Sequence, residues 1–334
     1  MDAALKVKLA FLSRPESYPD HPGRVEVIQT HMAWVFLTDR YVYKLKKPVR
    51  YPYLDFSTLE AREFYCRQEL HLNRRLAPDV YLDILPLTKG VNGRPILGGH
   101  GEILDFLVWM RRLPRERMLD TLLKNGCLER RHLQALAECL TDFYRVRPAQ
   151  LDGEAYRRRY CEAILLNCRE LETLRHALPG MNENAMCEAQ LVFLERWANW
   201  FDDRVAGGRI VEGHGDLKPA HVCFESAWPK IIDCLEFSRE LRLLDCADET
   251  AYLAMECDYM GYGQVGDWFL EDFGRYCKDD VPPAVRGFYM AYRATLRARL
   301  LLARTREAPP SKWSRWQRRA GRYLQLAAGY CPRR

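Results

Sequence analysis

Alternating apolar and polar residues predict a small β-sheet in the first third of the chain. Residues 24–47 contain short alternating stretches, a continuous apolar run at 32–37 and, after a polar turn, the run Tyr41–Lys46. Such runs, bounded by turn residues, are typical of β-strands. Two more strands are predicted over 80–87 and 103–109, with Asn-Gly and Gly-Gly turns between them. We therefore expect an antiparallel sheet in this region.

A helical period dominates most of the remaining chain. The sequence Ser57-Thr58-Leu59-Glu60 is a capping box that predicts one helix, running to Leu76, within the sheet region. A β-like interruption at 221–224 and 230–232, with a turn between the two runs, predicts a hairpin. Elsewhere, apolar residues spaced three and four apart predict helices over 115–125, 129–145, 154–177, 185–206 and from 247 to the end.

These elements together predict an α+β fold with two lobes. We expect an N-terminal lobe over residues 1–110, with the antiparallel sheet and one helix. A larger, mainly helical C-terminal lobe is expected over residues 111–334, with the hairpin inside it. A chain of 334 residues is long enough for both lobes to have cores of their own.

Composition argues against a membrane or secreted protein. No apolar run approaches the ~20 residues that a membrane-spanning helix needs, and Lys6 and Lys8 interrupt the only apolar stretch near the start. None of the twelve cysteines forms a Cys-x-x-Cys pair, and many lie in apolar runs. This usage indicates reduced, partly buried thiols. We therefore expect a cytoplasmic protein without a membrane span.

The net charge of +6 is concentrated near the end of the sequence. Residues 286–334 contain 13 lysines and arginines against a single acid, Glu307. Such a segment either attracts anionic partners or forms solvated helix surfaces, and both interpretations remain open. Nucleic acid is not the expected partner, because few aromatic residues interleave with the charges over 312–323, namely Trp313, Trp316 and Tyr323.

The candidate chemistry lies around the predicted hairpin. The segment His214-Gly215-Asp216-Leu217-Lys218-Pro219-Ala220-His221 leads into its first strand, and Asp233 follows its second strand. We expect the two aspartates, one at each end of the hairpin, to face one cleft, an arrangement that suits Mg²⁺ and phosphate groups. Aspartates at hairpin ends are also common as turn caps, so the prediction depends on the combination of loop, hairpin and second aspartate.

This combination resembles the catalytic loop and metal-binding segment of the aminoglycoside phosphotransferase-like family, a branch of the protein-kinase-like superfamily. In that family the pattern His-Gly-Asp-Leu-x-Pro-x-Asn is followed by a strand, a turn, two apolar residues and an aspartate. Five more stretches resemble a bacterial subgroup of the family, in the same order: Thr30–Val35, Tyr43–Pro48, Leu54–Glu60, Leu72–Pro78 and Met110–Pro114. The resemblance implies a bilobal protein-kinase-like fold and transfer of the γ-phosphoryl group of ATP to a hydroxyl.

The resemblance also implies roles for single residues. Asp216 would orient the acceptor hydroxyl and accept its proton, and Asp233 would hold the metal that bridges the nucleotide phosphates. Lys44 would reach the phosphates from its strand, paired with Glu69 of the following helix. Lys46 lies on the same face of that strand and is the alternative to Lys44.

Two positions depart from the family pattern. His221 stands where a metal-binding Asn is usual, and imidazole suits softer ions than Mg²⁺. Either His221 binds the metal through water, or Mn²⁺ is preferred, or this ligand is lost. The turn expected to cover the phosphates lacks glycines, so the Thr30 hydroxyl and backbone amides would contact phosphate there. Asp245 is expected to accept hydrogen bonds from the catalytic loop or to cap a helix. Glu236 is expected either near the metal or on the surface.

Arginines near the C-terminal end shape the expectation for the phosphoryl acceptor. Because arginine favours anionic groups, we expect a small hydroxylated metabolite, anionic ones included, with protein Ser/Thr residues as the alternative. A pseudokinase or a nucleotide-binding regulatory module is the competing class. The arginines concerned are Arg293, Arg297, Arg299, Arg304, Arg306, Arg315, Arg318, Arg319 and Arg322.

Overall fold

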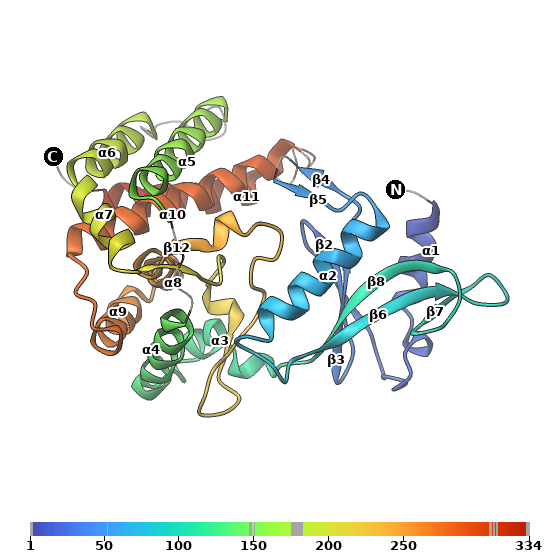
Figure 1. Cartoon of the computed structure of the whole chain (residues 1–334). Coiled ribbons are helices and arrows are strands. Elements are labelled where there is room, and N and C mark those ends of the chain that lie inside the picture. The colour runs from blue at the N-terminus through green and yellow to red at the C-terminus, as the bar shows by residue number, and fades with distance from the viewer. Residues whose placement is uncertain are drawn as a thin grey trace. The chain divides into compact units, whose positions relative to one another are not determined.

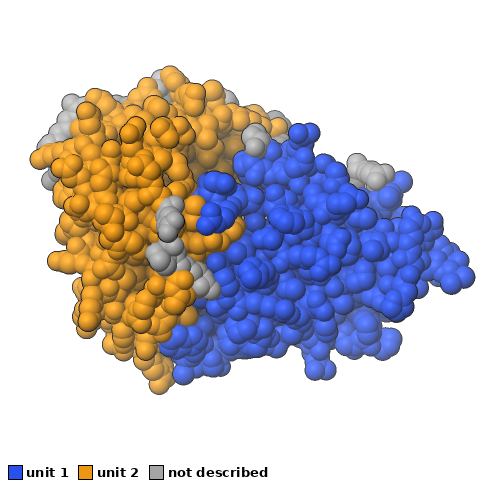
Figure 2. All heavy atoms as spheres, in the orientation of Figure 1, with its two compact units in different colours: residues 1–125, 220–241 blue, residues 126–219, 242–334 orange. Residues whose placement is uncertain are grey.

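The structure is a computed structural model that describes residues 3–51, 53–146, 149, 151–174, 183–306, 309, 311 and 313–331. The chain divides into two compact units, coloured separately in Figure 2. Unit 1 consists of residues 1–125 and 220–241, and unit 2 of residues 126–219 and 242–334. The segment with the predicted hairpin therefore belongs to the same unit as the N-terminal residues. The lobe boundary expected at residue 110 stays a prediction.

Unit 1 is built on a six-stranded antiparallel sheet, in the strand order β1-β2-β3-β8-β6-β7 (Figure 1). Its strands are β1 (Glu26–Gln29), β2 (Ala33–Leu37), β3 (Tyr41–Lys46), β6 (Tyr81–Lys89), β7 (Pro95–Leu97) and β8 (Ile103–Arg111). The other elements of the unit are α1 (Ala3–Leu12), β4 (Arg50–Tyr51), β5 (Leu54–Asp55), α2 (Leu59–Asn73), α3 (Leu119–Lys124), β10 (Val222–Cys223) and β11 (Lys230–Ile231). The predicted antiparallel sheet and the predicted hairpin, β10–β11, are both confirmed.

The two faces of the sheet have different neighbours. Tyr43 and Leu45 of β3 pack in a core with residues of α1, whereas Val108 of β8 packs in a second core with residues of α2. Because successive side chains of a strand point to opposite faces, Lys44 and Lys46 project to the α2 face. A lysine on that face needs an acidic partner, since burial of an unpaired charge is strongly unfavourable.

The helix α2 begins one residue later than the capping box predicts. Its N-cap is Thr58, whose hydroxyl accepts a hydrogen bond from the Ala61 N–H at 3.1 Å. Ser57 is already engaged, because its N–H and its hydroxyl both donate to the Asp55 carboxylate. The helix ends at Asn73.

Unit 2 is mainly helical. Its helices are α4 (Arg130–Arg145), α5 (Gly153–Thr173), α6 (Glu183–Arg196), α7 (Ala198–Ala206), α8 (Cys246–Tyr259), α9 (Gly263–Cys277), α10 (Pro283–Ala303) and α11 (Trp313–Tyr330). The single helix predicted over 185–206 is two helices, divided at Trp197, and the last residues predicted for 154–177 lie outside the described part. Two unpredicted strands, β9 (Ile210–Glu212) and β12 (Leu243–Asp245), form an antiparallel pair, and β12 directly precedes α8.

The helix α8 lies in the core of unit 2, and all twelve residues from Cys246 to Cys257 are buried. Its buried acids need partners, because an isolated carboxylate is costly away from water. Arg293 of α10 donates two hydrogen bonds to Asp248, at 2.7 and 2.6 Å. Arg297 lies 3.0 Å from Glu256. These C-terminal arginines are therefore internal counter-ions.

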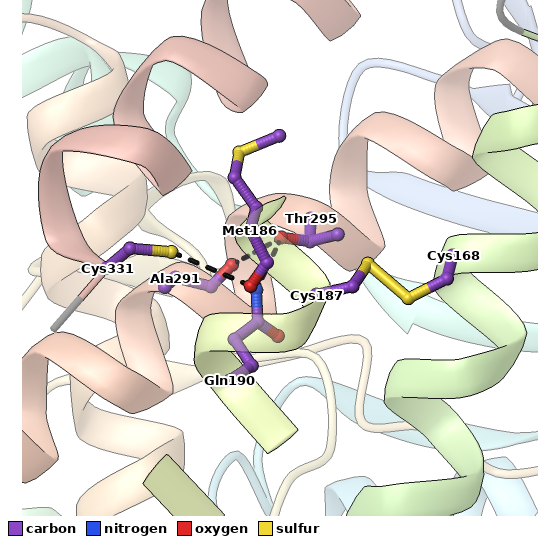
Figure 3. Close-up of a disulfide and its surroundings, with 7 residues drawn as sticks. All are labelled: Cys168, Met186, Cys187, Gln190, Ala291, Thr295 and Cys331. Carbon is purple, nitrogen blue, oxygen red and sulfur yellow. Dashed lines mark hydrogen bonds between the residues drawn. A yellow bond between two sulfur atoms is a disulfide. The ribbon is translucent and has the colours of Figure 1, made fainter. Parts of the chain in front are cut away.

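A disulfide joins Cys168 of α5 to Cys187 of α6 (Figure 3). The two Cα atoms are 6.1 Å apart, within the usual range for a disulfide. The expectation of reduced cysteines is therefore wrong for this pair, and a spacing of 19 residues across two helices carries no local motif that predicts it. Among the helices that the structure describes, none combines the length and apolar character needed to cross a membrane.

Candidate active site

Two lysines of β3 share one buried carboxylate of α2. Lys44 Nζ lies 2.8 Å from Glu69 Oε1, and Lys46 Nζ lies 2.7 Å from Glu69 Oε2. The Glu69 side chain is 0% exposed and the Lys46 side chain 1%, so their charges are balanced inside the protein. Burial alone would raise the pKa of Glu69, but attraction by Lys44 and Lys46 outweighs it and lowers that pKa.

The segment after β11 extends this arrangement. Asp233 Oδ1 lies 2.7 Å from Lys44 Nζ, and the Glu236 carboxylate contacts Lys46 Nζ. Burial favours the neutral form of Lys44, but the charges of Asp233 and Glu69 raise its pKa well above the usual value. Acids and lysines thus alternate along a continuous chain of contacts, in the order Asp233, Lys44, Glu69, Lys46 and Glu236.

The backbone at Asp233 is held in an unusual conformation. Its φ of +62° lies in the left-handed region, which residues other than glycine rarely adopt. The N–H of Asp233 donates to the Tyr81 hydroxyl at 3.0 Å, and the next N–H, of Cys234, donates to Asn73 Oδ1 at 2.8 Å. Strained conformations of this kind cluster at functional sites. Tyr81 and Asn73 are thus site residues that our sequence reasoning missed.

The donor atoms around Asp233 fit a divalent metal. Asp233 Oδ2 lies 3.4 Å from His221 Nε2, and the Asp233 side chain is 46% exposed. One exposed carboxylate, completed by phosphate oxygens and water, is a usual way to bind Mg²⁺. The neighbouring imidazole would add a ligand that suits Mn²⁺ better. Asp233 would hold such an ion, with His221 beside it.

Thr30 lies at the turn between β1 and β2. Its hydroxyl closes this turn, accepting from the Ala33 N–H at 2.9 Å and donating to the Ala33 carbonyl at 3.0 Å. The Lys47 ammonium contacts the Thr30 carbonyl. The hydroxyl is therefore already engaged in the turn, and its contact with phosphate stays a prediction.

Asp216 belongs to unit 2, where its own set of contacts holds it. Its Oδ1 accepts a hydrogen bond from the Tyr252 hydroxyl of α8 at 3.0 Å, and its Oδ2 lies 2.7 Å from Lys218 Nζ. The Asp216 N–H donates to His214 Nδ1 at 3.2 Å. The carboxylate is therefore oriented from both sides, and with 28% of the side chain exposed it stays accessible.

The loop that carries Asp216 is anchored on the buried carboxylate of Glu249. The N–H groups of His214 and Gly215 donate to this carboxylate, at 2.9 and 2.5 Å, and the Tyr144 hydroxyl adds a third hydrogen bond at 2.7 Å. Gly215 has a φ of +85°, which explains a glycine at this position. Three donors therefore satisfy the Glu249 charge.

Asp245 caps a helix, which is one of the two roles expected for it. Its carboxylate accepts the Ala247 N–H at 2.8 Å, so it is the N-cap of α8. Arg204 donates two more hydrogen bonds to it, at 2.8 and 2.6 Å. The N–H groups of His214 and Gly215, in the loop that carries Asp216, donate to Glu249 instead. Acids among the apolar residues of α8 are the pattern from which a buried role for Glu249 could have been inferred.

Comparison with known proteins places this geometry in a family. Residues 38–256 match the family described as "Phosphotransferase enzyme family". Uncharacterized proteins of Mycobacterium tuberculosis and Mycobacterium bovis are 33% identical to the chain over 296 residues, which is 86% of the chain. The match covers 56% of those proteins. The chain thus spans about half the length of the curated relatives it matches.

Solved structures agree with the family match. The GDP complex of wild-type aminoglycoside 2'-phosphotransferase-IIIa is 15% identical, with a TM-score of 0.53 over 98% of this chain and 99% of that one. A choline kinase from Cryptosporidium parvum is 11% identical, with a TM-score of 0.50 over 98% of this chain and 96% of that one. At such low identity the likeness shows the fold alone, and it confirms the predicted kinase-like architecture. The match over residues 38–256 shows that the chain belongs to the phosphotransferase enzyme family.

Proposed function

We propose that the protein transfers the γ-phosphoryl group of ATP to a hydroxyl of a small metabolite, in the cytoplasm. The observation that carries the proposal is the contact of Lys44 with both Glu69 and Asp233 inside unit 1. Phosphoryl transfer depends on positioning and on charge neutralisation more than on covalent chemistry. A fixed lysine beside a carboxylate suited to a metal supplies these two requirements.

Each residue of this group has a distinct role in the proposal. Lys44 binds the nucleotide phosphates, and Glu69 fixes the position of its ammonium group. Asp233 holds Mg²⁺, or Mn²⁺ in its place, with His221 as the neighbouring ligand. When bound, the metal would neutralise negative charge on the phosphates.

Lys46 and Thr30 have supporting roles in the proposal. Lys46 is occupied by Glu69 and Glu236 and is 1% exposed. We therefore propose that it stabilises the segment after Asp233 without touching the nucleotide. Thr30 shapes the turn between β1 and β2, whose backbone amides would contact phosphate.

Asp216 acts on the acceptor in this proposal. Its carboxylate accepts the proton of the acceptor hydroxyl while that oxygen forms a bond to the γ-phosphorus. The bond between this phosphorus and the β–γ bridging oxygen breaks, and ADP leaves. Tyr252 and Lys218 hold the carboxylate in place for the proton transfer. Retention of this base in a chain that also keeps Lys44, Glu69 and Asp233 favours an active enzyme over a pseudokinase.

The structure weakens one argument for an anionic acceptor. Several of the arginines on which it depended contact internal partners: Arg293 contacts Asp248, Arg297 contacts Glu256, Arg306 contacts Glu170, and Arg304 lies over the Trp316 ring. Exposed arginines remain on α11, among them Arg315 and Arg318. We therefore propose a small hydroxylated metabolite as acceptor. Anionic metabolites are included only because of the exposed arginines on α11.

Nucleotide binding is the first test. Unfolding is measured with ATP or GTP, each with Mg²⁺ or Mn²⁺, for the wild type, for Asp233→Ala and for the exposed-acid control Asp83→Ala. Nucleotide at about a hundred times its dissociation constant should stabilise the protein by roughly 2.7 kcal/mol. The proposal requires this shift in the wild type and the control and its loss in Asp233→Ala. No shift with either metal would contradict it.

Transfer is the second test. Labelled γ-phosphate is followed onto a panel of neutral polyols, sugar acids, sugar phosphates, aminoglycosides and serine peptides. Asp216→Asn should bind nucleotide like the wild type and transfer no measurable phosphate. Transfer to cationic aminoglycosides alone would overturn the proposed acceptor class and leave the kinase assignment in place.

A further inference from the structure

Two cysteines of unit 2, outside the proposed site residues, lie beside two arginines. Cys246 is the first residue of α8, and Cys277 is the last of α9. Their Sγ atoms and a carboxylate oxygen of Asp279 all lie within 4.8 Å of one another. Arg209 Nη1 donates to Cys277 Sγ at 3.3 Å, and Arg204 Nη2 donates to Cys246 Sγ at 3.7 Å. This places two thiols within reach of each other, each beside a guanidinium group.

The surroundings argue against a metal at this position. Asp279 accepts hydrogen bonds from two nitrogens of Arg204, so its carboxylate is already neutralised. Arg204 is itself paired with Asp279 and Asp245. The Arg209 guanidinium, which donates to Cys277 Sγ, would repel a cation bound there. A structural zinc ion, moreover, takes four ligands, and only three side chains gather here among the described residues. The arrangement suits a thiolate better than a metal.

The two thiols differ in ionisation. The hydrogen bond with Cys246, assisted by Arg209 against the effect of burial, lowers the pKa of Cys277 to about 7. The same hydrogen bond and burial raise the pKa of Cys246 well above its usual value. Cys277 is also the more exposed of the two, being half-buried while Cys246 is buried. Cys277 therefore has the properties of a nucleophile, and Cys246 those of a protonated partner.

We propose that Cys277 and Cys246 form an oxidation site, at which a peroxide oxidises Cys277 and Cys246 then closes a disulfide. In the first step the Cys277 thiolate attacks one oxygen of hydrogen peroxide, the O–O bond breaks, and a sulfenic acid and hydroxide result. In the second step the Cys246 sulfur attacks the sulfenic sulfur. The S–O bond breaks, and the hydroxyl leaves as water with the Cys246 proton. Two electrons pass from the thiols to the peroxide, and the site does not depend on the proposed kinase activity.

Peptide mapping tests the disulfide. The full chain is reduced, freed of reductant, treated with one equivalent of hydrogen peroxide and digested without reduction. A peptide pair linking 246 to 277 is expected in the wild type and in the control Cys127→Ser, which removes an exposed cysteine outside the pair. In Cys246→Ser the linked pair should be absent, and Cys277 should form an adduct with dimedone, a reagent for sulfenic acid. A folded wild-type protein without the linked pair would overturn the proposal.

Alkylation kinetics test the nucleophile independently. The rate of iodoacetamide reaction at Cys277, followed by mass spectrometry with Cys127 as the internal reference, should be half-maximal near pH 7. Arg209→Gln, checked for folding by circular dichroism, should move this midpoint up by about one pH unit or more, because it removes a neighbouring positive charge. An unchanged midpoint would contradict the proposal. So would stoichiometric Zn²⁺ binding that protects both thiols, which would make the cluster a metal site.

Discussion

The ammonium group of Lys44 lies 2.7 Å from the carboxylate of Asp233, although the two residues are 189 positions apart in the sequence. The same ammonium contacts Glu69, which is fully buried on α2. One lysine thus connects the helix that packs on the sheet to the strained turn after β11. This turn presents the exposed carboxylate of Asp233, with the imidazole of His221 beside it. The local order of this part of unit 1 therefore depends on a few buried charges.

Replacement of Lys44 by methionine should reduce phosphotransfer far more than it reduces stability. It removes the charge proposed to bind the phosphates, and loss of one such group typically lowers kcat by roughly 10²–10³-fold. The fold should survive, because Glu69 keeps its contact with Lys46. Steady-state kinetics with ATP measure the effect, with Lys89→Met on the exposed end of β6 as control. Wild-type kcat in Lys44→Met would rule out the proposed phosphate contact.

Replacement of Lys46 by methionine should reduce stability far more than it reduces phosphotransfer. Removal of one partner from a buried ion pair typically destabilises a protein by about 3–5 kcal/mol, and Glu236, at 9% exposure, would lose the partner that Lys46 provides. Adding Glu236→Gln to the same chain should recover part of this loss, since it removes the unpaired charge. Urea unfolding of the two single variants and the double variant measures the coupling. A raised KM for ATP with unchanged stability would instead show that Lys46 contacts the nucleotide.

The sequence predicted those parts of the site that depend on local patterns. The alternation in Tyr41–Lys46 places Lys44 and Lys46 on one face of a strand, and the two apolar residues before Asp233 mark the end of the hairpin. The pairing of Lys46 with Glu236 has no local pattern, because the two residues are 190 positions apart. A periodicity cannot reveal such a contact. It depends on the tertiary packing of the segment after β11 near α2.

Errors in the predicted fold have a similar origin. The strands β9 and β12 are three residues each, which is too short for a recognisable alternation. Their pairing depends on contact between two segments that 30 residues separate in the sequence, so no local pattern predicts it. The division of the helix predicted over 185–206 at Trp197 leaves the apolar spacing intact, so periodicity does not detect it. The disulfide between Cys168 and Cys187 likewise depends on how two helices pack.

Acidification should weaken the protein through Glu69. Its pKa is lower in the folded protein than in the unfolded chain, where a glutamate has a pKa of about 4.3. As the pH falls, the unfolded chain therefore binds this proton first, and protonation favours unfolding. The contribution of Glu69 is complete above about pH 5 and declines as the pH falls through about 4.3 and below. The stability difference between the wild type and Glu69→Gln should shrink over this window in urea unfolding. A stability difference between the two proteins that is constant with pH would contradict a lowered pKa of Glu69 in the folded protein.

Replacement of Glu249 by glutamine should impair catalysis through the loop that carries Asp216. The glutamine amide nitrogen cannot accept a hydrogen bond, so one of the N–H groups of His214 and Gly215 would face another donor. An unsatisfied buried donor costs about 1–3 kcal/mol, and a displaced loop should lower kcat while the KM for ATP stays near the wild-type value. Tyr144→Phe is the matched control, because it removes a hydrogen bond to Glu249 and leaves the loop contacts in place. Glu249→Gln protein that is folded and has wild-type kcat would show that this carboxylate does not position the catalytic loop.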